Sequence, residues 1–203
     1  MTDGRVVRTE EEAGEPAWQA VLVHERLPLI SYPYEWGFAM LQDAALLTLD
    51  LQLEALAEGF TLKDGSAYNV QFVGTRPVFM DVGSFERLVP GAVWAGYRQF
   101  CEQFLYPLML RAYRGLPFAP WLRGRLDGIA AEDAARLLGW RGALKPGVFS
   151  HVILQSRLQT LHAAESADLR GEIRQAGFGA ELLSAGLRRL RRLVAGLSWE
   201  PPA

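Results

Sequence analysis

The stretch from Leu62 to Phe85, LKDGSAYNVQFVGTRPVFMDVGSF, constrains the fold of this chain more than any other. Two short apolar runs, Val70–Val73 and Pro77–Met80, are separated by Gly74-Thr75-Arg76. Runs rich in β-forming residues and joined by a short glycine-containing link predict an antiparallel hairpin. Because a hairpin brings its two ends together, polar residues placed just before and just after it are expected to converge.

Three polar side chains flank the predicted hairpin at its open end. Asp64 and Asn69 precede it, and Asp81 follows it directly. Two carboxylates and an amide oxygen are hard ligands, suited to a Mg²⁺ ion that is held partly by phosphate oxygens. The alternative is a hairpin with ordinary Asx turns at both ends, in which these side chains bond only to nearby backbone.

A long helix is predicted from Phe38 to Glu58, immediately before this stretch. Its apolar residues keep the three-to-four spacing of one buried stripe. They are Leu41, Ala45, Leu49, Leu53 and Leu56. Gly59 predicts the C-terminal end of the helix.

A second amphipathic helix is predicted from Trp94 to Tyr113, with a kink or division at Pro107. Tyr97, Arg98 and Gln99 are candidates for facing the loops around the hairpin, and a solvated or core-edge position is the alternative. Further helices are expected within Glu132–Trp140, Phe149–Ala164 and Leu169–Leu197, and residues 84–90 are expected to form a loop. The predicted fold is therefore mainly α (α+β), with one central β-hairpin and little other sheet.

Composition sets broader limits on the class of protein. A chain of 203 residues, half of them hydrophobic, can bury one good core. The net charge of −2 gives no field that favours nucleic acid or an anionic membrane. No apolar run reaches the roughly 18 residues of a membrane span, and the polar, acidic first residues do not resemble a signal peptide, so we expect a cytoplasmic protein. One cysteine excludes an internal disulfide and a cysteine-rich zinc site, and the three scattered histidines are expected at the surface.

The order of Asp64, Asn69, hairpin and Asp81 resembles the catalytic and metal-binding loops of the protein-kinase fold, H-R-D-x-x-x-x-N followed by D-F-G. The resemblance implies that Asp64 positions or deprotonates an acceptor hydroxyl. It also implies that Asn69 and Asp81 hold Mg²⁺ or Mn²⁺ with a nucleotide.

The same stretch departs from the kinase pattern. Leu62-Lys63 stands where kinases have His-Arg, and Val82 stands where they have Phe, although Gly83 is kept. No lysine precedes Lys63, and no glycine-rich loop precedes Tyr32. Lys63 is the one cation that could replace the missing phosphate-binding lysine, and a surface lysine paired with a nearby carboxylate is the alternative. We therefore expect the chain alone to transfer no phosphoryl group.

The part before Tyr32 is too short for a complete kinase N-lobe. The resemblance thus implies a protein-kinase-like C-lobe with a reduced N-lobe. Residues 1–30 would be a partial N-lobe or a loosely ordered lead-in, and residues 31–165 the C-lobe core. Residues 166–203 would be a C-terminal helical extension, or a linker towards a further domain.

A wider resemblance covers about Val21 to Leu161. The runs ISYPYEWGFAMLQDAALLTLDLQLEAL, LKDGSAYNVQF, RPVFMDVGSFE and YRQFCEQFLYPLML are similar to the N-terminal region of a bacterial family of class I S-adenosylmethionine-dependent methyltransferases, some of them called nodulation-protein-like. In that family the methyltransferase domain follows on the C-terminal side, and S-adenosylmethionine would bind there. No strand followed by a glycine-rich turn and a later acidic residue occurs in this sequence, so methyl transfer is expected to lie outside it.

Two functional hypotheses follow from the resemblance. The first is a kinase-like domain of a methyltransferase-family protein that binds a metal-phosphate ligand or substrate through Asp64, Asn69 and Asp81. The alternative is a docking or substrate-presenting module without catalysis or nucleotide binding. The expected partners are accordingly a methyltransferase domain or a small phosphate-containing molecule.

Overall fold

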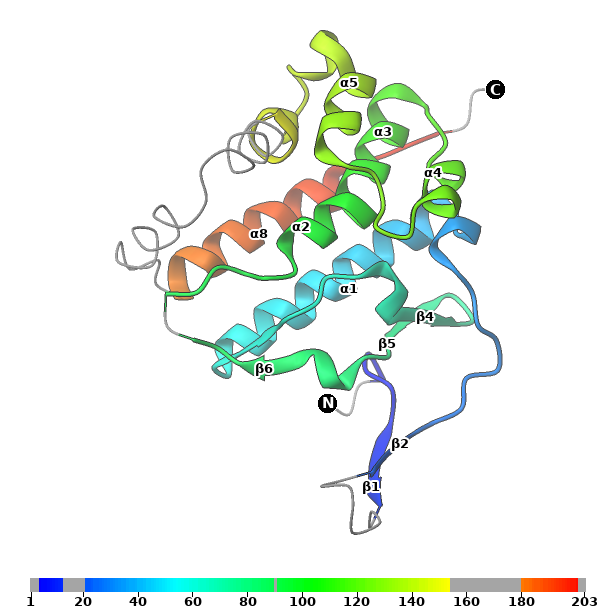
Figure 1. Cartoon of the computed structure of the whole chain (residues 1–203), viewed down its shortest axis with the longest axis vertical. Coiled ribbons are helices and arrows are strands. Elements are labelled where there is room, and N and C mark those ends of the chain that lie inside the picture. The colour runs from blue at the N-terminus through cyan, green and yellow to red at the C-terminus, as the bar shows by residue number, and fades with distance from the viewer. Residues whose placement is uncertain (1–3, 13–20, 90, 154–179, 201–203) are drawn as a thin grey trace.

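The computed structural model describes residues 4–12, 21–89, 91–153 and 180–200. These residues form a mixed fold of helices and small antiparallel strand pairs (Figure 1). The strands are β1 (Thr9–Glu12), β2 (Val21–His24), β3 (Phe60–Leu62), β4 (Val70–Val73), β5 (Arg76–Phe79) and β6 (Phe85–Arg87). The α-helices are α1 (Phe38–Ala57), α2 (Tyr97–Phe100), α3 (Tyr106–Arg114), α4 (Ala119–Gly124), α5 (Ala131–Gly142) and α8 (Ala180–Gly196).

Helix α1 is the long helix predicted from the apolar spacing, and it lies at the centre of the described fold (Figure 1). It is rich in Leu and Ala and contains neither Gly nor Pro, which favours an uninterrupted helix. Gly59 follows it with φ of 77°, a left-handed conformation that glycine adopts without strain, and this ends the helix. Burial extends beyond the predicted stripe, because α8 packs on one side of α1 and the strands and α3 on the other.

The second predicted helix forms as α2, a π-helical segment (Cys101–Leu105) and α3. Pro107 lacks an N–H group, and its ring crowds the carbonyl four residues earlier, so regular α-helical bonding cannot continue through it. The helix widens to π-helical bonding just before Pro107, where the Tyr106 N–H donates to the carbonyl of Cys101, five residues earlier. The helical bonding thus changes type just before Pro107, near the predicted kink or division, although helical residues run without a break from Tyr97 to Arg114.

The central hairpin is also confirmed. Strands β4 and β5 pair antiparallel in the register Val70↔Phe79 to Val73↔Arg76, joined by the two-residue turn Gly74-Thr75. Val70 and Phe79 are fully buried against the helices.

The expectation that residues 84–90 form only a loop is wrong. Strand β6 lies within this range and pairs antiparallel with β3, in the register Phe60↔Arg87 to Leu62↔Phe85. This pair encloses the hairpin in the chain order, so that β3 leads into it and β6 leads out of it. The sheet content is thus greater than the single hairpin predicted.

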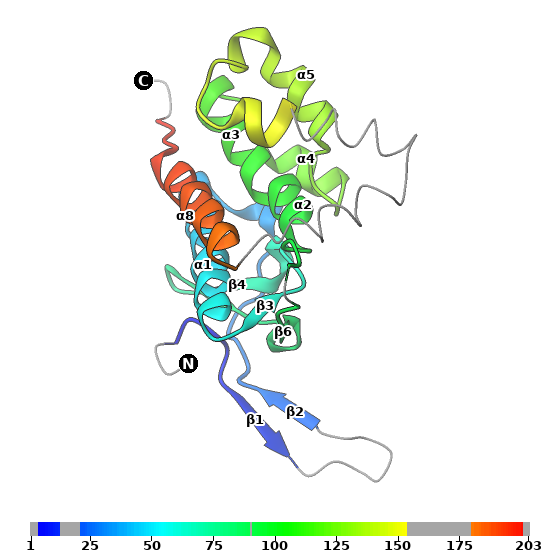
Figure 2. The same cartoon turned by 90° about the vertical axis from the view of Figure 1, so that its left-hand side faces the viewer.

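The described N-terminal residues form a two-stranded ribbon of β1 and β2 that extends away from the helices (Figure 2). The ribbon is joined to the hairpin by a parallel bridge between Val6 and Phe79. The Val7 N–H donates to the Phe79 carbonyl at 2.9 Å. Val6 and Val7 are both buried, so this segment covers the outer edge of β5.

Helix α8 packs along α1 and completes the core on that side (Figure 1). Its apolar residues Leu187, Leu190 and Val194 are almost completely buried. The Gln42 amide of α1 donates to the carbonyls of Val194 and Leu197, at 2.7 and 2.8 Å, which satisfies the end of α8.

Some of the predicted helices lie outside the described residues. Of Phe149–Ala164, only Phe149–Ile153 is described, and it is a π-helical turn. Of Leu169–Leu197, the described part is α8 with the residues after it. Among the described helices, none has the length and apolarity needed to cross a bilayer.

Candidate functional site

The candidate site lies where the two strand pairs meet, at the open end of the hairpin. The loop from β3 to β4 carries Lys63, Asp64 and Asn69, and the turn from β5 to β6 carries Asp81. The Lys63 N–H donates to the Ser84 carbonyl at 2.9 Å. The antiparallel pairing of β3 with β6 therefore holds the backbone beside Asp64 against the turn that follows Asp81.

Asn69 and Asp81 are brought into contact, as the hairpin predicted. The Asn69 Nδ2 atom donates to the Asp81 Oδ2 atom at 3.5 Å, and the Met80 N–H donates to the Asn69 carbonyl at 2.7 Å. Both side chains are half-buried. Asp81 stands at the start of a 3₁₀ turn, yet its carboxylate makes no bond to the backbone of that turn. Asp81 therefore does not form the Asx turn that the alternative interpretation predicts.

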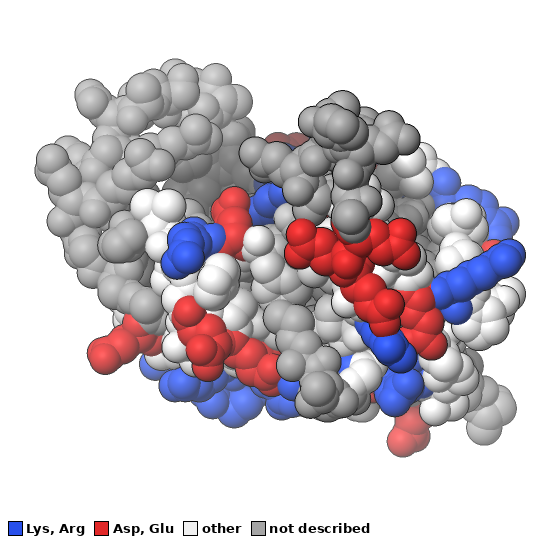
Figure 3. All heavy atoms as spheres, turned by 90° about the horizontal axis from the view of Figure 1, so that it is seen from below, with Lys and Arg blue, Asp and Glu red and all other residues white. Residues whose placement is uncertain are grey.

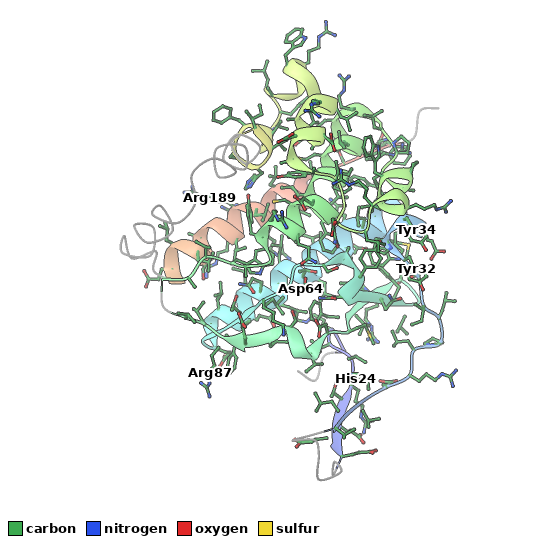
Figure 4. All side chains as sticks on the ribbon, in the orientation of Figure 1. His24, Tyr32, Tyr34, Asp64, Arg87 and Arg189 are labelled. Atoms are coloured by element: carbon green, nitrogen blue, oxygen red, sulfur yellow. The ribbon has the colours of Figure 1, made fainter. Side chains whose placement is uncertain are left out.

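Asp64 lies near the centre of the view in Figure 4, and its carboxylate forms an Asx turn. The Asp64 Oδ1 atom accepts the Ser66 N–H at 3.1 Å. The Asx-turn alternative is therefore correct for Asp64. Lys63 is exposed, and in the described part of the chain it forms no ion pair, so the predicted pairing with a nearby carboxylate is not seen there.

Two glutamines on the second helix hold the loop that contains Asp64. The Gln99 Oε1 atom accepts the Gly65 N–H at 3.0 Å, as expected for a residue facing the loops. The Gln103 Oε1 atom accepts the Ala67 N–H at 2.8 Å and the Ser66 hydroxyl at 3.0 Å. Sequence reasoning missed Gln103, which is buried within the π-helical segment.

The strand that leads into Asp64 is fixed by two further buried side chains. The Gln52 Oε1 atom of α1 accepts the Leu62 N–H at 2.7 Å. The Trp94 indole donates to the Leu62 carbonyl at 2.8 Å. Both backbone groups of Leu62 are thus satisfied by side chains, which aligns the residues that follow. A glutamine or a tryptophan in the sequence does not indicate which backbone groups it will bind, so neither contact was predicted.

A close backbone approach also shapes this loop. A Cβ atom added at Gly65 would lie 2.4 Å from the Gly96 carbonyl oxygen, and one added at Gly96 would lie 2.6 Å from the Gly65 nitrogen. Only two glycines allow the loop to lie this close to the start of α2.

The donor set at Asn69 and Asp81 fits a hard divalent cation that shares its coordination with a phosphate. Among the described residues, no group of three or more His, Cys, Asp or Glu side chains could hold a metal by itself. Mg²⁺ is commonly bound through only one or two carboxylates together with phosphate oxygens and water, and does not require such a cluster. A half-turn of the Asn69 amide would present its oxygen beside Asp81 in place of Nδ2.

A cavity of about 560 Å³ lies between the N-terminal segment and the hairpin. Val82, the residue after Asp81, lines it, and its charged lining residues are Arg8, Glu25 and Arg76. Arginine is a common partner of phosphate groups because its planar fork can donate two parallel hydrogen bonds.

All three histidines were predicted at the surface, and the structure bears on each of them differently. His24 is exposed on β2 at the ribbon (Figure 4), whereas His162 lies outside the described residues. His151 is half-buried, which makes the surface prediction wrong for this residue. Its Nδ1 atom lies 2.6 Å from the Tyr97 hydroxyl, and burial lowers its pKa.

A comparison with known proteins finds similarity to a nodulation protein. The chain is 41% identical over 177 residues to "Nodulation protein NoeA" of Rhizobium meliloti (strain 1021). The match covers 87% of this chain but 37% of the relative, so the chain spans well under half of that protein's length. No family model matches the chain, and no solved structure matches it. The expected similarity to a nodulation protein is thereby confirmed, while the kinase-like fold and the methyltransferase connection stay predictions.

Proposed function

We propose that this chain is a kinase-like binding domain that holds a divalent cation, with a phosphate-containing ligand, at Asn69 and Asp81. The observation that carries the proposal is the contact between these side chains across the open end of the hairpin, at 3.5 Å. The two side chains offer the oxygen ligands that Mg²⁺ or Mn²⁺ prefers. In this proposal the described core corresponds to a protein-kinase-like C-lobe with a reduced N-lobe.

The surroundings of the site support the proposal. The loop before the hairpin is held by Gln99 and Gln103, and the β3–β6 pair fixes its position against the turn after Asp81. A preorganised loop loses less conformational entropy when a ligand binds. A bound cation would neutralise charge on the phosphate oxygens. Asp64 would then orient a hydroxyl group of the substrate, and exposed Lys63 would be available to an anionic group.

Methyl transfer is assigned in this proposal to residues outside this chain, where S-adenosylmethionine would also bind. The chain then contributes ligand binding, and a methyltransferase domain is its expected partner. The similarity to a nodulation protein more than twice as long as the matched region is compatible with such a further domain.

The second candidate is a docking or substrate-presenting module that binds no nucleotide. The absence of a lysine before Lys63 and of a glycine-rich loop before Tyr32 favours it. The Asx turn at Asp64 favours it as well, because that carboxylate already has a structural role.

Thermal unfolding of the purified chain with Mg²⁺ and ATP separates the two candidates. At ligand concentrations about 100-fold above Kd, binding to the folded state should add about 2.7 kcal/mol, or about 5–10 °C in Tm for a chain of this size. The Asp81→Ala variant should lose this rise. The Asp64→Asn variant should keep it, because an asparagine oxygen can still accept the Ser66 N–H and the cation lies at the other residues.

The matched control is Asp127→Ala, which removes an exposed carboxylate from the turn between α4 and α5. Its Tm should rise with Mg²⁺ and ATP as the wild type does. An unchanged Tm in the wild type would favour the docking module. A rise of equal size in Asp81→Ala would show that the nucleotide binds elsewhere.

A further inference from the structure

The β1–β2 ribbon has an exposed apolar strand. Val21, Leu22 and Val23 are 38%, 48% and 41% exposed, although they form three of the four residues of β2. In the described part of the chain, β2 pairs only with β1. A two-stranded ribbon is marginally stable in water, and an open apolar edge is a ready template for another strand.

The hydrogen-bond pattern shows which backbone groups this edge offers. The Glu25 N–H donates to the Arg8 carbonyl at 2.9 Å, so these residues form a hydrogen-bonded pair in the ribbon register. Hydrogen-bonded and non-bonded pairs alternate along an antiparallel ladder. The N–H and C=O groups of Leu22 and His24 therefore point away from β1, towards the open edge.

The two strands of the ribbon differ in charge. Strand β1 contains Glu10, Glu11 and Glu12, and charged side chains on an edge discourage pairing. Strand β2 contains no Asp, Glu, Lys or Arg. Figure 3 looks at the molecule from the side of the ribbon, where acidic side chains gather among basic ones. Of the two strands, β2 is the one suited to pair with an uncharged strand.

We propose that two copies of this chain pair through β2, antiparallel, about a two-fold axis that passes between the Leu22 residues. In this register Leu22 of each copy lies opposite Leu22 of the other, and Val21 lies opposite the other copy's Val23. The N–H and C=O groups of Leu22 point towards the open edge, so the two Leu22 residues form a hydrogen-bonded pair. Every cross-strand pair of these residues is apolar, which stabilises a sheet.

The charges of the ribbon allow a second copy to pair in this arrangement. The strand order becomes β1–β2–β2–β1, which separates the two acidic strands by three spacings, about 14 Å at about 4.8 Å each. That distance exceeds the Debye length of about 8 Å at physiological salt, so repulsion between the glutamates is largely screened. Pairing through β1 would instead place the glutamates on adjacent strands.

The contact is short, so the dimer is expected to be weak. Four residues of each strand bury less than the roughly 1,000 Å² of a stable interface, and we expect a dissociation constant on the order of 10–100 µM. Sedimentation equilibrium should show a mass that rises from 22.6 kDa towards twice that value with concentration. The Leu22→Lys variant should weaken this association at least tenfold, because it places two like charges directly opposite each other.

The control for added charge is Leu144→Lys, at an apolar residue that is 86% exposed and lies outside the ribbon. It should associate as the wild type does. A wild type that stays at the monomer mass up to about 500 µM, fivefold above the weakest expected dissociation constant, would overturn the proposal. A Leu22→Lys variant that associates as strongly as the wild type would do so too.

A crosslinking variant tests the register in a second way. It is expected to gain a linked dimer, whereas a variant that had lost its fold would gain none. In a hydrogen-bonded pair the Cα atoms lie about 5.5 Å apart, which suits a disulfide. Leu22→Cys should form a disulfide-linked dimer under mild oxidation. Glu11→Cys, opposite Leu22 within the ribbon, should not. Cys101 is fully buried and should add no background. Equal crosslinking of the two variants would contradict the pairing through β2.

Discussion

The half-buried side chains of Tyr97 and His151 meet although 54 residues separate them in the chain. If the Tyr97 hydroxyl donates, the His151 Nδ1 atom must accept, which requires a neutral imidazole with its proton on Nε2. The Tyr106 hydroxyl donates to the His151 carbonyl at 2.6 Å and fixes the same turn. Burial also raises the pKa of the adjacent Cys101 thiol to about 12, so this cysteine is a packed, unreactive group.

His151 should make the stability of the protein depend on pH. Burial lowers its pKa in the folded state below the unfolded value of 6.5, so folding favours the neutral ring. This contribution is fully present above pH 6.5 and is lost as the pH falls through the lowered folded pKa. We expect the free energy of unfolding, measured with urea, to decrease between pH 7.5 and pH 5.

The His151→Gln variant keeps a hydrogen-bond acceptor but cannot take up a proton, so it should lose part of this decrease. His24→Gln is the matched control, because it removes an exposed histidine from a different element, β2. A His151→Gln variant with the same pH dependence as the wild type would show that His151 is not responsible. The sequence could not reveal this role, because the partner of His151 comes from a distant helix.

At the scale of elements, local pattern predicted α1 and the β4–β5 hairpin correctly. Each has its signal within about 20 consecutive residues: apolar spacing for the helix, and β-forming runs around a glycine-containing turn for the hairpin. The β3–β6 pair was missed because strands of three residues carry too little periodicity. Its register depends instead on Gln52 and Trp94, which bind Leu62 from two different parts of the chain.

The contact between Asn69 and Asp81 could be predicted, because it needs only the hairpin that joins them. The position of Asp64 depends on more distant groups, namely Gln99, Gln103 and the glycine pair Gly65 and Gly96. Sequence reasoning therefore placed the two residues linked by local structure. It identified only Gln99 among the residues that hold the loop.

The close approach of the Asp64 loop to α2 should make Gly65 sensitive to substitution. Gly65→Ala places a methyl group 2.4 Å from the Gly96 carbonyl oxygen, and that oxygen belongs to backbone that cannot move by side-chain rotation. We expect a loss of about 1–3 kcal/mol in the free energy of unfolding, typical of overpacking. Gly186→Ala is the contrasting variant, since nothing lies within 4 Å of its added Cβ in α8. It should gain about 0.5–1 kcal/mol from helix propensity, and equal effects of the two substitutions would rule out the steric explanation.

At the scale of the whole molecule, α8 belongs to the same core as α1. The predicted extension or linker over residues 166–203 includes this helix, whose buried stripe lies against α1. Arg191 pairs with Asp50 of α1, with its Nη2 atom 2.9 Å from Oδ2. Both side chains are partly exposed, so this ion pair is expected to contribute little beside the apolar contacts. The amphipathic pattern of α8 could be read from the sequence, but the surface that it covers could not.

If α8 is part of that core, truncating a buried residue in α8 or in α1 should affect one common unfolding transition. Leu190→Ala in α8 and Leu49→Ala in α1 should each lower the free energy of unfolding by about 2–5 kcal/mol, because each side chain is at most 2% exposed. Leu182→Ala, on the same helix but 56% exposed, should change it by less than about 0.5 kcal/mol. Urea unfolding followed by circular dichroism and by tryptophan fluorescence should give coincident curves for all three variants. If α8 were a separate extension, Leu190→Ala would leave the tryptophan transition unmoved while Leu49→Ala shifted it.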